Sequence, residues 1–202
     1  MHLQDRRLAA LAGAFAIGAL ALAGTASASE TIIGGRADAC SLAAKASNFD
    51  PLAIENCTVA IFTEPLTEHL LAATYVNRGT MYIGVMNYAS ALSDFDEALK
   101  LEPTMAEAWV NRGGALIGLH RFKEAEENID KGLALMPEEP EKAYGNRALA
   151  RWSLDNLKGA YEDFQTALSL KPDWGWPAEQ LEAFKVETAG AAAEASRPTA
   201  GR

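Results

Sequence analysis

The sequence predicts an all-α solenoid of stacked helix-turn-helix units, and a fixed repeat, helical spacing and regularly placed prolines carry that prediction. The repeat is visible in three stretches, Tyr75-Val76-Asn77-Arg78-Gly79, Trp109-Val110-Asn111-Arg112-Gly113 and Tyr144-Gly145-Asn146-Arg147-Ala148. Their last residues, at positions 79, 113 and 148, are separated by 34 and 35 residues. A period of this length is typical of stacked supersecondary units, which present an extended surface rather than a closed catalytic pocket.

Residues 1–28 are predicted to be a secretory signal peptide. Two arginines precede an apolar run over residues 8–23, and Ala26-Ser27-Ala28 has the small-x-small pattern of a cleavage site. The run is shorter than the roughly 20 residues that a transmembrane helix needs. We expect the mature chain to begin near Ser29 with a linker over 29–36, to cross the inner membrane and to reside in the periplasm. An uncleaved membrane anchor is the alternative.

The mature chain is acidic, with 16 basic and 26 acidic residues once the predicted signal is removed. Such a surface repels phosphate groups, which argues against nucleic acid or an anionic membrane as the partner. No membrane insertion is expected after cleavage. The charge favours solubility, and weak self-association is an allowed alternative.

Each predicted unit contains two amphipathic helices, identified by apolar or small residues spaced three and four apart. Repeat 1 (72–105) has Tyr75, Gly79 and Tyr82, then Ala91, Phe95 and Ala98, then Pro103. Repeat 2 (106–140) has Trp109, Gly113 and Leu116, then Ala125, Ile129 and Gly132, then Pro137. Repeat 3 (141–174) has Tyr144, Ala148 and Arg151, then Ala160, Phe164 and Ala167, then Pro172. Each proline ends a second helix because it lacks an N–H donor and clashes with the preceding turn.

This set of residues resembles the tetratricopeptide repeat family, whose pattern is aromatic, Leu, Gly, aromatic, Ala, aromatic, Ala, Pro over about 34 positions. The resemblance covers about residues 72–174 and implies a right-handed superhelical stack of three full repeats. The chain departs from the pattern at Arg78, Arg112 and Arg147, where the family has Leu, and at Arg151, where it has an aromatic residue.

An arginine at a helix-packing position can bury its stem and pair its head group. We therefore expect Arg78 to pair with Asp94 across the helices of repeat 1, and Arg147 with Asp163 across those of repeat 3. With such a pair, Arg78→Leu should leave the free energy of unfolding nearly unchanged or improved. A loss above about 3 kcal/mol would indicate a further buried network.

A degenerate helical pair is predicted upstream of the repeats, over 37–71. The second-helix pattern is matched there by Ala53, Cys57, Ala60 and Pro65. Cys40 falls on the facing first helix, and Asp50 is expected to cap the second helix with Pro51 at its first position. An even number of cysteines in an exported chain favours a disulfide, and a Cys40–Cys57 bond would stabilise the fold by about 3 kcal/mol. Two buried free thiols are the alternative.

After repeat 3, residues 175–187 are expected to form a capping helix, because the last unit of a solenoid must cover an exposed apolar edge. Trp174 and Trp176 at its start are assigned to packing of the cap, although the groove of the repeats could instead hold this tail. Residues 188–202, rich in small residues, are predicted to be disordered.

No constellation for catalysis, metal binding or a cofactor is found in the sequence, so we predict that the protein is not an enzyme. The histidines outside the signal, His69 and His120, lie in separate repeats, whereas a metal site needs convergent ligands. No glycine-rich phosphate loop follows a strand.

The resemblance implies a ligand groove on the first helices of successive units. The expected peptide-binding residues are Val76, Asn77, Thr80, Val110, Asn111, Lys142, Asn146 and Trp152. The three asparagines resemble the asparagine ladder in the repeat region of the O-linked N-acetylglucosamine transferase, where amides pair with the backbone of an extended peptide. Local bonding within each helix pair is the alternative. The carboxylate clamp of chaperone-binding members is a poorer match, with Asn111 and Lys142 alone in agreement.

The sequence thus predicts an exported, non-enzymatic protein–protein interaction module that binds an extended segment of another protein in its groove. The alternative is a structural or assembly subunit that associates through its repeat ends and has no groove ligand. Both functions are inferred by analogy with a fold that serves many partners.

Overall fold

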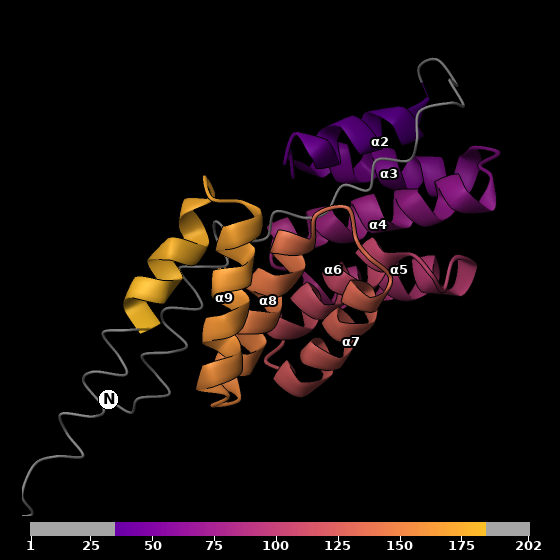
Figure 1. Ribbon diagram of the computed structural model, residues 1–202. Helices are drawn as coiled ribbons and strands as arrows, with labels where there is room; N and C mark the ends of the chain where they lie inside the picture. Colours follow the sequence, from indigo (N-terminus) through magenta and orange to yellow (C-terminus); the bar gives the residue numbers. More distant parts are fainter. Residues whose placement is uncertain (1–34, 185–202) are drawn as a thin grey trace, which may run out of the picture.

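The computed structural model describes residues 35–184, which form a single stack of helices (Figure 1). The helices are α2 (Arg36–Lys45), α3 (Pro51–Thr63), α4 (Glu68–Gly84), α5 (Tyr88–Leu101), α6 (Ala106–Gly118), α7 (Phe122–Ala134), α8 (Pro140–Ser153) and α9 (Leu157–Leu170). Residues 175–184 are also helical, and no strand occurs within the described part of the chain. The predicted all-α solenoid is confirmed. The predicted signal peptide and disordered tail lie outside the described residues.

Neighbouring helices pair along the chain as α2/α3, α4/α5, α6/α7 and α8/α9, and each second helix also packs on the next first helix. Figure 1 shows this order as a progression from the indigo α2–α3 pair to the yellow C-terminal segment. Helix α4 begins at Glu68, ahead of the boundary at 72 that the repeat pattern indicates, because the Thr67 side chain caps it. The Leu70 N–H donates to the Thr67 hydroxyl at 3.3 Å.

The two helices of a repeat approach closely where the first helix carries a small residue. A Cβ atom added to Gly79 would lie 2.7 Å from the ring of Phe95, and one added to Gly113 would overlap the side chain of Ile129. Phe95 and Ile129 are both fully buried. The glycines are therefore required by packing, since a larger side chain would have to push the helices apart.

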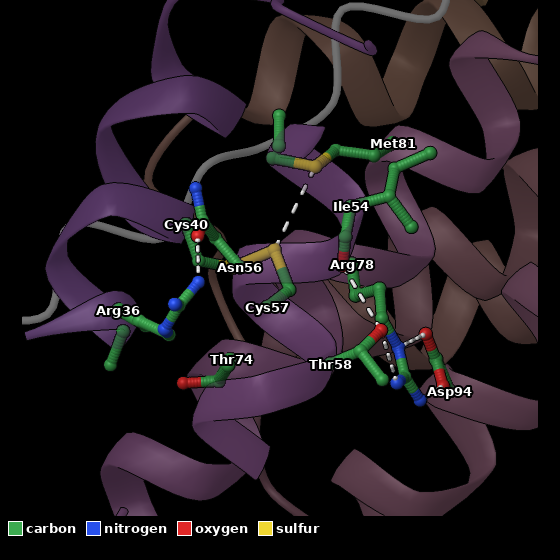
Figure 2. Close-up of a disulfide and its surroundings, with 12 residues drawn as sticks. Arg36, Cys40, Ile54, Asn56, Cys57, Thr58, Thr74, Arg78, Met81 and Asp94 are labelled. Atoms are coloured by element: carbon green, nitrogen blue, oxygen red, sulfur yellow. Dashed lines mark hydrogen bonds and ion pairs between the residues drawn. A yellow bond between two sulfur atoms is a disulfide. The ribbon is translucent and has the colours of Figure 1, made fainter. Parts of the chain in front are cut away.

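Two of the arginines that replace the leucine of the family pattern, Arg78 and Arg147, form the predicted ion pairs. Arg78 donates two hydrogen bonds to the Asp94 carboxylate, at 2.8 and 2.7 Å, as Figure 2 shows. Arg147 does the same with Asp163, at 2.9 and 2.8 Å. Both carboxylates are buried, and a bidentate charged pair is among the stronger hydrogen-bonded contacts in proteins.

Each of these arginines also reaches the second helix of the preceding unit, which the sequence analysis did not anticipate. Arg78 Nη1 donates to Thr58 Oγ1 of α3 at 3.1 Å, and Arg147 Nη1 donates to Asp130 of α7 at 2.6 Å. Burial lowers the pKa of Arg147, but its bonds to Asp163 and Asp130 more than offset this, so its pKa lies above the ordinary value. The arginines thus tie successive units together.

Repeat 2 follows the same arrangement with a weaker set of partners. Arg112 donates to Asn128 on its own second helix at 2.9 Å and to Asp96 of the preceding repeat at 2.8 Å. In repeat 3, Arg151 replaces an aromatic residue of the family pattern. It donates to Glu126 at 2.7 Å and to Asp163 at 2.9 Å, and Asp163 also accepts from Arg147. A guanidinium therefore takes the place of apolar packing at these positions.

The N-terminal pair is closed by a disulfide. The Sγ atoms of Cys40 and Cys57 are 2.10 Å apart, and both residues are fully buried; Figure 2 shows Met81 of α4 beside them, its sulfur 3.7 Å from Cys57 Sγ. Asp50 accepts a hydrogen bond from the Ala53 N–H at 2.7 Å, with proline in the first turn of α3. This bond holds the pKa of Asp50 below its ordinary value. The cap lies where the sequence predicts it.

No helix within residues 35–184 is both long enough and apolar enough to cross a lipid bilayer.

Because the Asp94 carboxylate is buried, removal of either partner from the Arg78–Asp94 pair is expected to be costly, and this revises the expectation from the sequence that Arg78→Leu would be nearly neutral. Asp94→Ala leaves a guanidinium with 11% side-chain exposure unpaired, so the free energy of unfolding in urea should fall by about 3 kcal/mol. The double variant Arg78→Leu/Asp94→Leu removes both charges and should recover most of that loss. Thr58 keeps its bond to the Ile54 carbonyl in this variant. A double variant as unstable as Asp94→Ala would contradict this account.

The disulfide should stabilise the stack by constraining the unfolded chain. Its cysteines are 17 residues apart, so Cys40→Ala/Cys57→Ala should lose about 3 kcal/mol against the oxidised protein in urea unfolding. The reduced wild-type protein is the control and should unfold close to the double variant. Equal stability of the oxidised and reduced protein would contradict the prediction.

Candidate functional site

The inner surface predicted from the first helices is formed by α4, α6 and α8, but most of the predicted contact residues are covered. Val76, Thr80 and Val110 are at most 2% exposed, and Asn77 and Asn111 are 5% and 4% exposed. Asn111 Nδ2 donates to Thr80 Oγ1 of the preceding first helix at 3.4 Å. Thr80 and Asn111 thus meet between adjacent first helices, whereas Val110 packs against Gly132 on the second helix of its own repeat. Their role as ligand contacts stays a prediction.

Asn146 is the most accessible of the three predicted asparagines and is half-buried. Its amide nitrogen lies 3.6 Å from the position that a Cβ on Gly114 would take, so the side chain faces the neighbouring first helix. Absence of a side chain at Gly114 leaves room for this amide. The structure thus directs Asn111 and Asn146 toward the preceding first helix, at Thr80 and Gly114, and buries Asn77.

Lys142 and Trp152, the other predicted contacts, are engaged elsewhere. Lys142 Nζ lies 2.6 Å from a carboxylate oxygen of Glu139, and its side chain is 9% exposed. The ring of Trp152 packs edge-on against Phe164 and Phe184, with centroids 6.3 and 5.8 Å away. Lys142 is therefore poorly placed to receive a ligand carboxylate, and Trp152 belongs to the core beneath the C-terminal segment.

The C-terminal segment covers the inner surface at repeat 3. A Cβ atom on Gly145 would lie 2.8 Å from the ring of Trp176 and 3.2 Å from that of Trp174. The two indole rings lie beside each other, with centroids 5.2 Å apart, and Trp176 also packs on Phe164 at 5.9 Å. The predicted cap therefore closes this end of the surface.

A recess remains open at the other end of the surface, between repeats 1 and 2. Its volume is about 270 Å³. Its floor consists of Ala73, Val76, Met105, Ala106 and Leu135. Its rim carries His69, Glu102, Thr104, Glu107, Met136 and Glu138. We refer to these residues together as the inner recess, which combines an apolar floor with a polar edge.

The rim of the inner recess is negatively charged. His69 Nδ1 lies 2.7 Å from Glu102 Oε1, and the Glu138 N–H donates to Glu107 Oε1 at 3.2 Å. The residues that line the recess include three glutamates but neither Lys nor Arg. Met136 adopts a positive φ of 58° and is 85% exposed, so its side chain projects at the edge.

Within residues 35–184, no three His, Cys, Asp or Glu side chains gather as a metal site would require.

Two family models of the tetratricopeptide repeat match the chain, over residues 86–149 and 141–173. Residues 86–173 of the chain therefore consist of tetratricopeptide repeats. A search of curated proteins found no significant match. This chain shows the features of the family: paired helices, small residues where the two helices of a pair cross, and a proline after each second helix.

Solved tetratricopeptide repeat structures resemble the stack. The first such domain of human RPAP3 is 25% identical, with 65% of this chain and 100% of that chain covered and a TM-score of 0.58. The second domain of human RPAP3, in complex with the HSP70 peptide SGPTIEEVD, is 25% identical, with 59% and 98% covered and a TM-score of 0.54. MamA from Desulfovibrio magneticus RS-1 is 22% identical, with 80% and 91% covered and a TM-score of 0.61, and shows the fold alone.

Sequence reasoning missed the inner recess because it considered only the first helices of the tetratricopeptide repeats. Glu102 precedes Pro103, and Met136 and Glu138 flank Pro137, so these residues come from the connections between units. A usable signal was present, since an acidic residue adjoins the closing proline in both connections.

The indole N–H of Trp176 is buried and finds no acceptor among the described residues. Trp176→Phe keeps the aromatic packing on Phe164 and removes this donor, so its free energy of unfolding should change by no more than about 1 kcal/mol. Trp176→Ala should lose about 3 kcal/mol or more, because it empties the cap. Urea unfolding of both variants checks this. If Trp176→Phe lost as much stability as Trp176→Ala, the indole N–H rather than the packing of the ring would stabilise the cap, which would contradict this prediction.

Proposed function

We propose that this tetratricopeptide repeat protein is a non-enzymatic interaction module that binds an extended segment of another protein on its inner surface, at the inner recess. The observation that carries the proposal is the recess itself, a hollow of about 270 Å³ with an apolar floor and an acidic rim, left open where the cap does not reach. Related folds whose structures contain an HSP70 or HSP90 peptide support a peptide as the ligand.

Among the predicted contacts, Val76 and Asn146 have the clearest part in this proposal. Val76 forms part of the floor of the inner recess. Asn146 offers the accessible amide beyond it, in repeat 3. The hydrogen bond between Asn111 and Thr80 joins two first helices, and the buried Asn77 and Val110 lie beneath the surface. An extended segment would lie across α4 and α6, with one side chain in the recess and its backbone directed toward Asn146.

Acidic C-terminal peptides of the kind bound by the RPAP3 domains are not the ligand that we propose. The peptides SGPTIEEVD and SRMEEVD carry adjacent glutamates, and the rim of the inner recess is itself acidic. Lys142, the cation that matches the carboxylate clamp, is paired with Glu139. Like charges brought together disfavour such a complex.

Assembly through the repeat ends is the second candidate, and one observation favours it. Leu42, Leu52 and Phe62 are 68%, 63% and 74% exposed on the α2–α3 pair, which stands at one end of the stack (Figure 1). Large apolar side chains exposed on the end pair of a solenoid are available for contact with another unit. Sedimentation at increasing concentration separates the candidates, since end-to-end assembly raises the mass and a groove-binding monomer does not.

Export to the periplasm is also part of the proposal. The buried Cys40–Cys57 pair at disulfide distance supports it, because disulfides persist in oxidising compartments. The amino-terminal sequence of the protein isolated from the periplasm tests this point. A chain that begins near Ser29 supports export with cleavage, and a chain that retains residues 1–28 contradicts it.

Blocking the inner recess should abolish peptide binding without unfolding the protein. Ala73→Trp fills the floor, whereas Ala89→Trp makes the same change at an exposed position of α5. Against peptides selected from a displayed random library, the first variant should lose at least about tenfold in affinity by fluorescence anisotropy and the second should not. Both should keep the helical circular dichroism of the wild-type protein. Equal binding by Ala73→Trp would place the ligand elsewhere.

A further inference from the structure

We infer that the inner recess selects segments in which an apolar side chain is flanked by lysine or arginine, and that it rejects acidic segments. This inference rests on the function proposed above and adds the chemistry of the partner. Three features of the recess support it: its size, its floor and the charge of its rim.

The size of the recess suits the side chains of a ligand. Its volume is about 270 Å³. The floor is made partly of the small residues Ala73 and Ala106, which leave space for one or two apolar side chains of a ligand. An extended chain provides such groups from alternate residues.

The apolar lining of the recess is adaptable at two points, one in the floor and one at the edge. Met105 and Met136 both line the recess, and methionine side chains adjust to different apolar shapes because they are unbranched and polarizable. Met136 is largely exposed before any ligand binds. The floor therefore requires an apolar side chain without specifying which one.

The rim sets the charge of the partner. Glu102, Glu107 and Glu138 surround the floor, and the only basic group among the lining residues is His69, which contacts Glu102. A lysine or arginine beside the apolar anchor can lay its stem along the floor and bring its charge to these carboxylates. A segment that carries Asp or Glu at the same place meets like charge. Charge complementarity thus favours a basic, partly apolar segment over a second copy of this acidic chain.

The test uses the full mature chain and a phage-displayed library of random dodecapeptides. The enriched peptides should carry Lys or Arg next to a large apolar residue and should be depleted in Asp and Glu. Synthetic peptides with Lys-Leu-Lys at the centre should bind about tenfold more tightly than matched peptides with Glu-Leu-Glu, and this difference should shrink at high salt.

Charge-neutral variants locate the effect at the rim. Glu107→Gln/Glu138→Gln retains an acceptor for the Glu138 N–H, so it should keep its fold and lose most of the preference for basic peptides. The control Glu127→Gln/Glu179→Gln makes the same change in net charge at exposed positions away from the recess and should retain the preference.

The outcomes separate this inference from the function on which it rests. Enrichment of acidic or uncharged peptides that the Ala73→Trp variant fails to bind would overturn the inference and leave the binding module intact. A preference that survives in Glu107→Gln/Glu138→Gln would also overturn it. If the library yields no peptide that depends on Ala73, both proposals fail.

Discussion

The close contact between the two helices of each repeat is the constraint on which the rest of the structure depends. At Gly79 and Gly113 the first helix has no side chain, so Phe95 and Ile129 of the second helix press against its backbone. This contact fixes how far each first helix lies from its partner, and thereby how close successive first helices come. Burial of the asparagines and the shape of the inner surface follow from this spacing. Burial of apolar side chains stabilises the helix pairs, and the glycines allow the two helices of a pair to approach closely.

Charged groups then join one repeat to the next. Arg78 and Arg147 each hold a carboxylate on their own second helix and a second acceptor on the unit before. Such buried pairs contribute little net stability compared with apolar packing, but loss of one partner is costly. Their value lies in orientation, because a planar guanidinium with two directed partners specifies how units meet. At the C-terminal end, indole rings rather than arginines continue the packing and close the surface.

Much of the fold could be predicted because its geometry is expressed in residue spacing. Glycines or alanine at 79, 113 and 148 mark the helix crossings, and Asp50 before Pro51 marks the start of α3. The site could be predicted only in part. Whether Asn77 is exposed depends on the approach of a neighbouring unit, which no local pattern records. The inner recess includes Met136, which adopts a positive φ. This backbone conformation is uncommon for residues other than glycine, so a methionine in the sequence does not predict it.

The central claim is that the partner lies on the inner surface rather than at the end of the stack. Site-specific photo-crosslinking tests this most directly, with a photoreactive amino acid in place of Met136 at the recess and, separately, of Phe62 at the exposed end, both of which are accessible. The account predicts crosslinks to another polypeptide from position 136, competed by a basic apolar peptide, and none to a second copy from position 62. Crosslinks between copies of this chain through position 62, with none from position 136, would contradict it.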